Sequence, residues 1–265
     1  MKNIYKEQNE GRYTTLYDYT KLSFIERLYF NISPTTIVIR RLFTILDTYK
    51  NKQTSKRKLK ILDIGCGGGI KDLTLRGDVV GIDISQLSIR NARKIYKKVI
   101  VGDLSKKYPF PNESFDIAFC SEVYGHIADR DKEHFLLEVK RVLKKDGLFL
   151  FSCETKGDNW LTRSLKKRKE YQKLWVDYDG HIGLESPNKV IERFKKHFLD
   201  VNYKVNNTYI FTVDELLPIY PLLNGVFKNI IMRRFANILL FPVYILSVTF
   251  TKLSAANNIC IYGKK

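Results

Sequence analysis

The sequence predicts an α/β fold with a largely parallel sheet, and three observations support this prediction. Short apolar runs typical of strands recur at residues 59–64, 78–84, 98–103, 115–121 and 147–153. Runs typical of helices, at residues 85–98 and 131–145, lie between some of them. A glycine-rich turn follows the first strand, in the stretch ILDIGCGGGI at residues 61–70. Strands that alternate with helices form parallel sheets that are covered on both faces.

The predicted helices carry signals at their ends. The helix at residues 131–145 has acidic residues in its first turn, lysines in its last turn and Gly147 as a C-terminal stop. Ser186 and Pro187 open another helix over residues 186–198, since serine caps a helix and proline suits its first position.

A length of 265 residues is consistent with one large domain made of several segments. Residues 1–58 form a helical cap that ends in a polar, basic linker, and residues 59–153 form the alternating core. Residues 154–211 contain a basic insert, a helix and a strand. An apolar helical insert at residues 212–256 precedes a closing strand at residues 257–265.

The formal net charge of +18 indicates an anionic partner: nucleic acid, an acidic membrane surface or a phosphorylated substrate. A basic surface that keeps the protein soluble by self-repulsion is the alternative. The N-terminal residues hold no apolar run, so we expect no secretory signal. The cysteines have no CxxC spacing and lie in apolar runs, which predicts buried thiols in a reducing compartment: Cys66, Cys120, Cys153 and Cys260.

The glycine-rich turn and two acidic residues predict a nucleotide-like cofactor site. Glycines allow positive φ and the close approach of a ligand, although a ligand-free tight turn would also use them. Asp83 ends the second strand, where a carboxylate can accept both ribose hydroxyls, and Asp103 follows the third, where it can accept from an exocyclic amine. The carboxyl ends of neighbouring parallel strands are where open α/β sheets bind ligands.

Six segments in unbroken order resemble the class I S-adenosylmethionine-dependent methyltransferases, and among them the ubiquinone and menaquinone biosynthesis group. Between Leu59 and Cys153 they read LDIGCGGG, GIDIS, GDLS, YPFPNESFD, SEVYGHI and LLEVKRVLKKDGLFLFS, and a weaker match covers residues 177–198. The resemblance implies a Rossmann-like seven-stranded sheet of order 3-2-1-4-5-7-6 with its last strand antiparallel. The GxGGG spacing departs from the dinucleotide pattern and disfavours a nicotinamide cofactor. The connection between Gly69 and Val79 is short for the family's first crossover helix.

The resemblance also implies a set of residues that bind S-adenosylmethionine. The set is Asp63, Gly65, Cys66, Gly67, Asp83, Ile84, Asp103, Leu104 and Ser121. Asp63 would reach the amino end of the methionine part, which would lie against the backbone of the glycine-rich turn. Asp83 would hold the ribose and Asp103 the adenine amine, although solvated or capping roles are the alternatives for these acids. Ile84 and Leu104 would flank the ring.

His126, His181 and Glu122 are the predicted catalytic residues. Methyl transfer is an in-line displacement that depends on positioning, and a base is needed only when the acceptor arrives protonated. Packing is the alternative role for His126 and capping for Glu122, while His181 lies in a loop where related enzymes often carry a histidine facing the acceptor. Tyr124 is a further candidate base. Gly125 stands where some quinone O-methyltransferases have an acid that assists a metal, so no metal is expected.

The C-terminal insert bears on the acceptor. Residues 235–251 contain no charge, and no acidic residue follows Glu215. The apolar run is near the lower limit for a membrane span, Pro242 interrupts it, and the closing strand must return to the sheet, which argues against spanning. Helices lying in the interface of an anionic membrane, or a lid on the domain itself, remain as alternatives. The basic insert at residues 163–175 suits RNA, lipid or diphosphate phosphates.

The sequence therefore predicts a cytoplasmic methyltransferase, peripheral on the inner face of the membrane. It would methylate an oxygen or carbon of a small or lipid-linked acceptor, such as a quinone precursor or a lipid-carried glycan. The alternatives are a tRNA or rRNA methyltransferase and a non-catalytic regulatory protein that binds the cofactor. Nucleic acid is the less favoured partner, because the chain has neither an appended RNA-binding module nor an Asn-Pro-Pro-Tyr-type motif.

Overall fold

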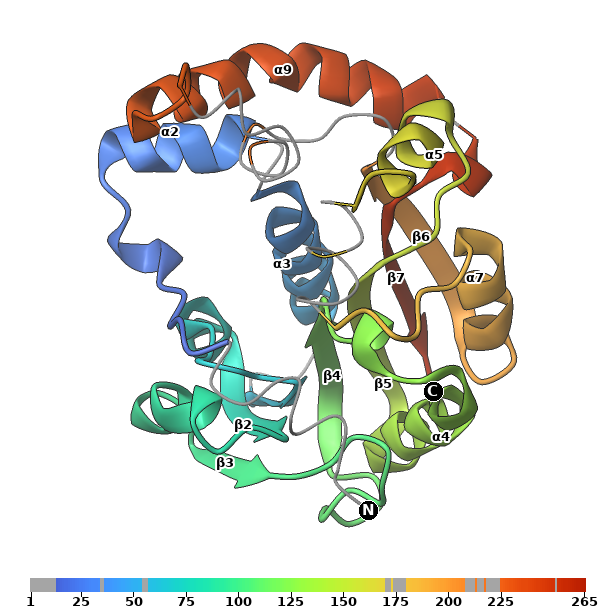
Figure 1. The fold of residues 1–265 in the computed structure, drawn as a ribbon. Coiled ribbons are helices and arrows are strands. Elements are labelled where there is room, and N and C mark those ends of the chain that lie inside the picture. Colours follow the sequence, from blue (N-terminus) through green and yellow to red (C-terminus); the bar gives the residue numbers. More distant parts are fainter. Residues whose placement is uncertain are drawn as a thin grey trace.

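A seven-stranded sheet forms the centre of the molecule (Figure 1). The computed structural model describes residues 13–33, 36–53, 57–169, 173, 180–207, 213, 217, 225–250 and 252–265. The strands are β1 (Leu59–Ile64), β2 (Gly77–Asp83), β3 (Lys98–Val101), β4 (Phe115–Ser121), β5 (Leu143–Glu154), β6 (Leu199–Asn207) and β7 (Asn258–Lys264). Their order is β3-β2-β1-β4-β5-β7-β6, and β7 runs antiparallel to both of its neighbours. The predicted order and the antiparallel last strand are confirmed.

Helices flank the sheet and extend beyond it. The α-helices are α2 (Phe24–Ile32), α3 (Ile37–Asn51), α4 (Lys132–Val142), α5 (Trp160–Lys166), α7 (Pro187–Lys195) and α9 (Ile230–Phe250). Short 3-10 turns are η1 (Tyr19–Lys21), η3 (Lys71–Leu75), η4 (Ser88–Arg90), η5 (Ala92–Lys94), η6 (Tyr124–His126), η7 (Asp129–Asp131) and η10 (Leu253–Ala255). The predicted N-terminal helices and the helical insert before the last strand are present.

The central strands are buried on both faces, as their continuous apolar sequence predicts. Successive side chains of a strand point to opposite faces. Ala118 and Cys120 of β4 therefore pack with one apolar cluster, which includes residues of α4 and α7. Ile117 and Phe119 pack with the other cluster, which includes α3. These two clusters fix the sheet between its helical layers and hold the strand ends in place.

The predicted helix over residues 85–98 is wrong, because this segment forms only the turns η4 and η5. The segment's apolar residues have helical spacing, but its polar contacts are tertiary. The Tyr96 hydroxyl donates to Asp63 Oδ2 at 2.6 Å, and the Asn91 amide donates to the carbonyl of Thr14 at 2.9 Å. These contacts tie the segment to the glycine-rich turn and the N-terminal residues. By contrast, the short connection after that turn is observed as predicted, because η3 takes the place of a full crossover helix.

Helix ends follow the expected chemistry. Ser186 Oγ accepts a hydrogen bond from the Lys189 amide at 3.4 Å, and Pro187 occupies the first turn of α7, as predicted. At α2, Ser23 and Glu26 form a reciprocal capping box. These caps satisfy amide groups that the first turn of a helix leaves without intrahelical partners.

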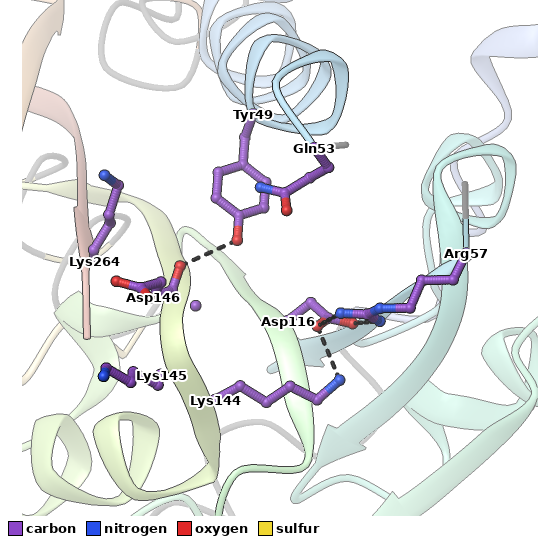
Figure 2. A pocket seen from close by; sticks show the side chains of 9 residues that line it. Tyr49, Gln53, Arg57, Asp116, Lys144, Lys145, Asp146 and Lys264 are labelled. Carbon is purple, nitrogen blue, oxygen red and sulfur yellow. Dashed lines mark hydrogen bonds and ion pairs between the residues drawn. The ribbon is translucent and has the colours of Figure 1, made fainter. Parts of the chain in front are cut away.

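A hollow of about 370 Å³ lies at the amino ends of β4 and β5 (Figure 2). It is lined by Tyr49, Gln53, Arg57, Asp116, Lys144, Lys145, Asp146, Gly147 and Lys264. Figure 2 shows Arg57 and Lys144 converging on Asp116, at distances of 2.5 and 2.9 Å. Asp116 also accepts a hydrogen bond from the Lys60 amide at 2.8 Å. This buried carboxylate therefore clamps the starts of β1, β4 and β5 together.

Replacing Asp116 should destabilise the fold. The hydrogen bonds from Arg57, Lys144 and the Lys60 amide hold the pKa of Asp116 well below its ordinary value. Asp116→Ala leaves these donors without their acceptor, which should lower the free energy of unfolding by about 3 kcal/mol in urea titrations at pH 7. Asp78→Ala is the matched control. It removes an exposed carboxylate that pairs with Lys97, and exposed pairs contribute little.

The same clamp should depend on pH. Because the folded pKa of Asp116 lies below its unfolded value, its contribution is complete above about pH 5 and is lost as the pH falls through about 4 and below. The difference in stability between wild type and Asp116→Ala should therefore shrink at low pH. Equal losses for Asp116→Ala and Asp78→Ala, or a difference that grows on acidification, would contradict the clamp.

Candidate active site

The candidate site lies where the parallel strands end. The glycine-rich turn follows β1, Asp83 ends β2, Asp103 follows β3, Glu122 follows β4 and Glu154 ends β5. The strands pair in register, so that Ser121 lies opposite Ser152 and Asp83 opposite Val101. The structure thus brings the predicted cofactor residues and the predicted base Glu122 to one edge of the sheet.

The glycine-rich turn folds onto the neighbouring strand. Gly65, Gly67 and Gly69 have φ of 69°, 45° and 88°, a backbone conformation that favours glycine. The amides of Gly65 and Cys66 both donate to the carbonyl of Ile82, at 2.8 and 3.2 Å. The amide of Cys66, one of the predicted cofactor residues, therefore already has an acceptor within the fold.

The N-terminal segment crosses over this turn. Tyr17 pairs with Ile70 as a parallel bridge, and the Tyr17 amide donates to the carbonyl of Gly69 at 3.0 Å. A Cβ at Gly68 would lie 2.2 Å from the carbonyl oxygen of Thr15 and 2.4 Å from that of Thr14. Gly68 is therefore required by the chain's own packing, a reason for glycine that the sequence did not reveal.

Asp63 is a buried acid at the start of the turn. It accepts the Tyr96 hydroxyl at 2.6 Å, and burial raises the pKa of Asp63 to about 7. The neighbouring Asp83 carboxylate adds to the rise. A shifted acid at a ligand-binding edge is typical of a functional site. A cation beside Asp63 would stabilise its charged form.

Asp83 and Asp103 are both held by backbone amides. Asp83 accepts from the amides of Gly67 at 2.9 Å and Ser85 at 2.8 Å. Asp103 accepts from the Ser105 amide at 2.9 Å and from its hydroxyl at 2.7 Å. Both acids are half-buried, as are the apolar Ile84 and Leu104 that follow them. The carboxylates are oriented and reachable, so their predicted roles toward ribose and adenine stay predictions that suit the site.

Glu122 forms an acid pair with Glu154. The Glu154 charge acts on Glu122, which accepts from Ser152 Oγ and, at 2.8 Å, from Asn258 Nδ2. Glu122 has φ of 58°, the left-handed region that residues other than glycine rarely adopt. Such strained conformations cluster at functional sites.

The pair holds one proton, and the surrounding charges place it. Burial and the neighbouring Glu154 charge raise the pKa of Glu122 well above its ordinary value. His181, whose Nε2 lies 3.7 Å from Glu154 Oε1, lowers the pKa of Glu154. Like charges in contact cannot both ionise freely, so Glu122 carries the proton and Glu154 the charge.

The two predicted histidines lie against each other. The rings of His126 and His181 stack with centroids 4.6 Å apart, and His126 Nδ1 lies 3.3 Å from the carbonyl of Gly180, to which it donates in the matching tautomer. Tyr13 of the N-terminal segment packs edge-on against His126. The structure therefore brings all three predicted catalytic residues together, with His126 one layer further from the acid pair.

A buried ion pair fixes the loop that carries His181. Lys132 Nζ lies 3.2 Å from Glu185 Oε2 and donates to the carbonyl of Gly183 at 2.6 Å. The Gly183 amide donates in turn to the carbonyl of Gly125 at 2.9 Å. Tyr124 is buried, and its hydroxyl donates to Glu185 at 3.1 Å. Tyr124 therefore helps to hold the His181 loop and does not contact the acid pair through this hydroxyl.

The cysteines and Ser121 are the remaining candidates from the sequence. All four cysteines are free and buried, as predicted, and burial raises the pKa of the Cys66 and Cys120 thiols, which makes them poor nucleophiles. Ser121 Oγ lies 3.2 Å from Ser152 Oγ. Within the part of the chain that the structure describes, no group of three histidine, cysteine or acidic side chains could hold a metal ion.

Comparison with known proteins identifies the family. Residues 62–151 match a family described as a methyltransferase domain. A ubiquinone biosynthesis O-methyltransferase of Pelagibacter ubique is 31% identical over 178 residues, which cover 59% of this chain and 69% of that protein. The chain belongs to the class I S-adenosylmethionine-dependent methyltransferases, in the type 11 group. The cofactor of this methyltransferase is S-adenosylmethionine.

Other relatives match shorter segments. The ubiquinone biosynthesis O-methyltransferase of Glaesserella parasuis is 35% identical over 107 residues, which cover 35% of this chain and 44% of that protein. An uncharacterised Methanocaldococcus jannaschii protein is 35% identical over 108 residues, covering 40% and 42%. The methyltransferase thus spans less than half the length of several curated relatives that it matches.

Solved structures show the same fold. Haemonchus contortus phosphoethanolamine N-methyltransferase 2 aligns with a TM-score of 0.53 at 19% identity, covering 92% of this chain and 60% of that one. A Thermotoga maritima S-adenosylmethionine-dependent methyltransferase aligns with a TM-score of 0.52 at 17% identity, covering 90% and 92%. The chemistry of the site suits the cofactor, because three carboxylates at the ends of the adjacent strands β1, β2 and β3 offer acceptors for an ammonium group, ribose hydroxyls and an amine.

Binding of the cofactor should depend on the charge of Asp63. With its pKa at about 7, Asp63 is largely protonated at pH 6 and must lose this proton to hold the cofactor's ammonium group. We expect affinity for S-adenosylmethionine, measured by calorimetry, to rise about tenfold from pH 6 to pH 8. Asp63→Asn should weaken binding at pH 8 and flatten this dependence. An equally steep profile in the variant would assign the titration to another group.

Binding should also require Asp83. Asp83→Ala removes the predicted ribose acceptor and the acceptor of the Gly67 amide, so affinity should fall at least about tenfold. Asp78→Ala is the matched control, because Asp78 lies on the same strand at its opposite end. Unchanged affinity in Asp83→Ala would contradict this placement of the cofactor.

Proposed function

We propose that the methyltransferase transfers a methyl group to an oxygen or carbon of a small or lipid-linked acceptor at a membrane surface, on the cytoplasmic side. The observation that carries the proposal is the acid pair Glu122–Glu154, which lies beside His181 at the edge where the cofactor-binding acids end their strands. An ionised carboxylate in this position supplies a base for an acceptor that arrives protonated.

Glu154 is the base in this proposal. Its Oε2 is buried, and no hydrogen-bond donor among the described residues reaches it. Gly125 lies opposite, and a Cβ there would come within 3.1 Å of the His181 and Leu184 side chains and 3.6 Å of Oε2, so the glycine lets the His181 loop pack against the carboxylate. An acceptor hydroxyl can donate to this oxygen and pass its proton there as the new bond forms. His181 stabilises the charge of Glu154 before the transfer.

Glu122 keeps the base in position. Because it holds the shared proton, it donates to Glu154 while Ser152 and Asn258 donate to its own oxygens. When bound, the cofactor supplies a methyl group that is attached to a sulfonium. Loss of this methyl group turns the sulfonium into a neutral thioether, which is a good leaving group. Asp63, Asp83 and Asp103 would hold it, and the N-terminal segment over the glycine-rich turn would help to exclude water.

Two observations support this class of acceptor. The curated relatives named ubiquinone biosynthesis O-methyltransferases favour a phenol-type oxygen on a quinone precursor. The apolar helix α9 and the net charge of +18 favour an acceptor that is carried in or near an anionic membrane. The buried free cysteines suit a reducing compartment.

The acid pair should respond unequally to substitution. Glu154→Gln removes the base and should lower methyl transfer about a hundredfold, while affinity for S-adenosylmethionine stays within about twofold. Glu122→Gln resembles the protonated carboxyl and should stay within about tenfold of wild type. The assay follows labelled methyl groups from S-adenosylmethionine into the lipid, RNA and soluble pools of a cell extract.

An exposed acid on α7 provides the control. Glu192→Gln makes the same chemical change away from the site and should leave transfer unchanged. Label in the lipid or soluble small-molecule pool supports the proposal. Label confined to RNA, or cofactor binding without transfer into any pool, would contradict it.

A further inference from the structure

The outward face of α9 is apolar along its whole length. At 100° per residue, one arc of this helix carries large side chains that are exposed: Ile231, Met232, Phe235, Leu239, Val243, Leu246 and Phe250. Phe235 and Leu239 are each 61% exposed and Phe250 is 81% exposed. Monomeric soluble proteins rarely expose a continuous apolar surface of this kind, which marks an interaction site.

The opposite face holds α9 to the fold at two points. Near its first turns, Asn237 is buried, accepts from the Val213 amide at 2.9 Å and donates to the Tyr29 hydroxyl at 3.3 Å. Two turns later, Tyr244 is buried and its hydroxyl donates to the carbonyl of Asn206 at the end of β6. These anchors lay the helix flat along one end of the molecule (Figure 1).

The short helix α2 lies beside α9 (Figure 1) and carries exposed apolar side chains of its own. Phe24 is 83% exposed and Ile25 is 74% exposed, and Leu28 follows one turn later. Arg234 of α9 lies over the ring of Tyr29, which joins the two helices on their inner sides. We call the apolar arc of α9, together with the exposed Phe24, Ile25 and Leu28 of α2, the α2–α9 face.

Exposed basic residues surround this face. Lys228 precedes α9, Lys252 follows it, and Lys21 and Arg27 lie next to and within α2, all of them exposed. No acidic residue follows Glu215 in the sequence to offset Lys228 and Lys252, whereas Lys21 lies 3.8 Å from Asp18. A second copy of the chain would bring like charges together, whereas an anionic bilayer offers hydrocarbon to the apolar arc and negative headgroups to the lysines.

We propose that the α2–α9 face docks flat in the interface of an anionic lipid bilayer. Although α9 is long and apolar enough to cross a membrane, its anchored face and the return of the chain into β7 favour an in-plane helix. A chain of hydrogen bonds connects α9 to the candidate active site. Asn206, which accepts from Tyr244, donates to Asn258 at 2.8 Å, and Asn258 donates to Glu122. The usefulness of docking for catalysis rests on the proposed function.

Co-sedimentation with vesicles tests the proposal. Full-length protein should sediment with vesicles of phosphatidylcholine and phosphatidylglycerol, remain in solution with phosphatidylcholine alone, and lose binding as salt rises. Leu239→Gln with Leu246→Gln should weaken binding at least about tenfold. Lys228→Gln and Lys252→Gln should each weaken it about fivefold at low salt.

Matched control variants distinguish binding through the α2–α9 face from non-specific hydrophobic adsorption and non-specific charge attraction. Leu75→Gln with Leu199→Gln alters two leucines that are similarly exposed elsewhere, and Lys106→Gln with Lys107→Gln removes two exposed lysines from another surface. Both should bind like wild type. Equal losses in test and control variants, binding that ignores lipid charge, or a dimer in solution that the Leu239 and Leu246 changes dissociate would overturn the proposal.

The outcome is independent of the methyl-transfer assay. Asp83→Ala should bind vesicles like wild type even though it loses the cofactor, because Asp83 lies at the end of β2 and not on the α2–α9 face. Vesicle binding without transfer to lipid or to a small molecule would therefore count against the proposed acceptor alone. Transfer to a small molecule without vesicle binding would count against docking and the membrane location, and would leave the acceptor class standing.

Discussion

The constraint on which the site depends is the parallel register of β1 to β5. Because neighbouring strands run in the same direction and pair in register, each delivers its last residues to the same edge. The glycine-rich turn, Asp83 and Glu154 meet there although they are far apart in sequence. At the opposite edge of the sheet, the Asp116 clamp fixes where β1, β4 and β5 begin. The positions of their carboxyl ends depend on these fixed starts.

Features with a local cause could be predicted from the sequence, and tertiary ones could not. The cap of α7 at Ser186 and the places of Asp83 and Asp103 at strand ends follow from local patterns, whereas the strand order was implied by the resemblance to the family. The failed helix at residues 85–98 has helical spacing, but distant partners set its path. Gly68 shows the same limit, since the chain that crosses it is about fifty residues earlier. Glu154 was missed although it ends a strand, and the rule applied to Asp83 would have found it.

The two glutamates of the acid pair have the same side chain but different protonation states. Glu122 lies in a strained backbone conformation, and its burial beside the Glu154 charge keeps it neutral although Ser152 and Asn258 donate to its oxygens. Glu154 faces a histidine and keeps its charge. No residue type in the sequence distinguishes them, because the difference arises from partners that only the folded sheet supplies.

The sheet order has a consequence for how the site is completed during synthesis. β7 is made after β5 and β6 but lies between them, so the sheet keeps a gap until residues 258–264 are available. These residues bring Asn258, the donor to Glu122, and they follow α9 directly in the chain. The acid pair therefore gains its last partner only after α9 has been made. In a nascent chain, the apolar helix α9 is therefore synthesised before the candidate active site can be completed.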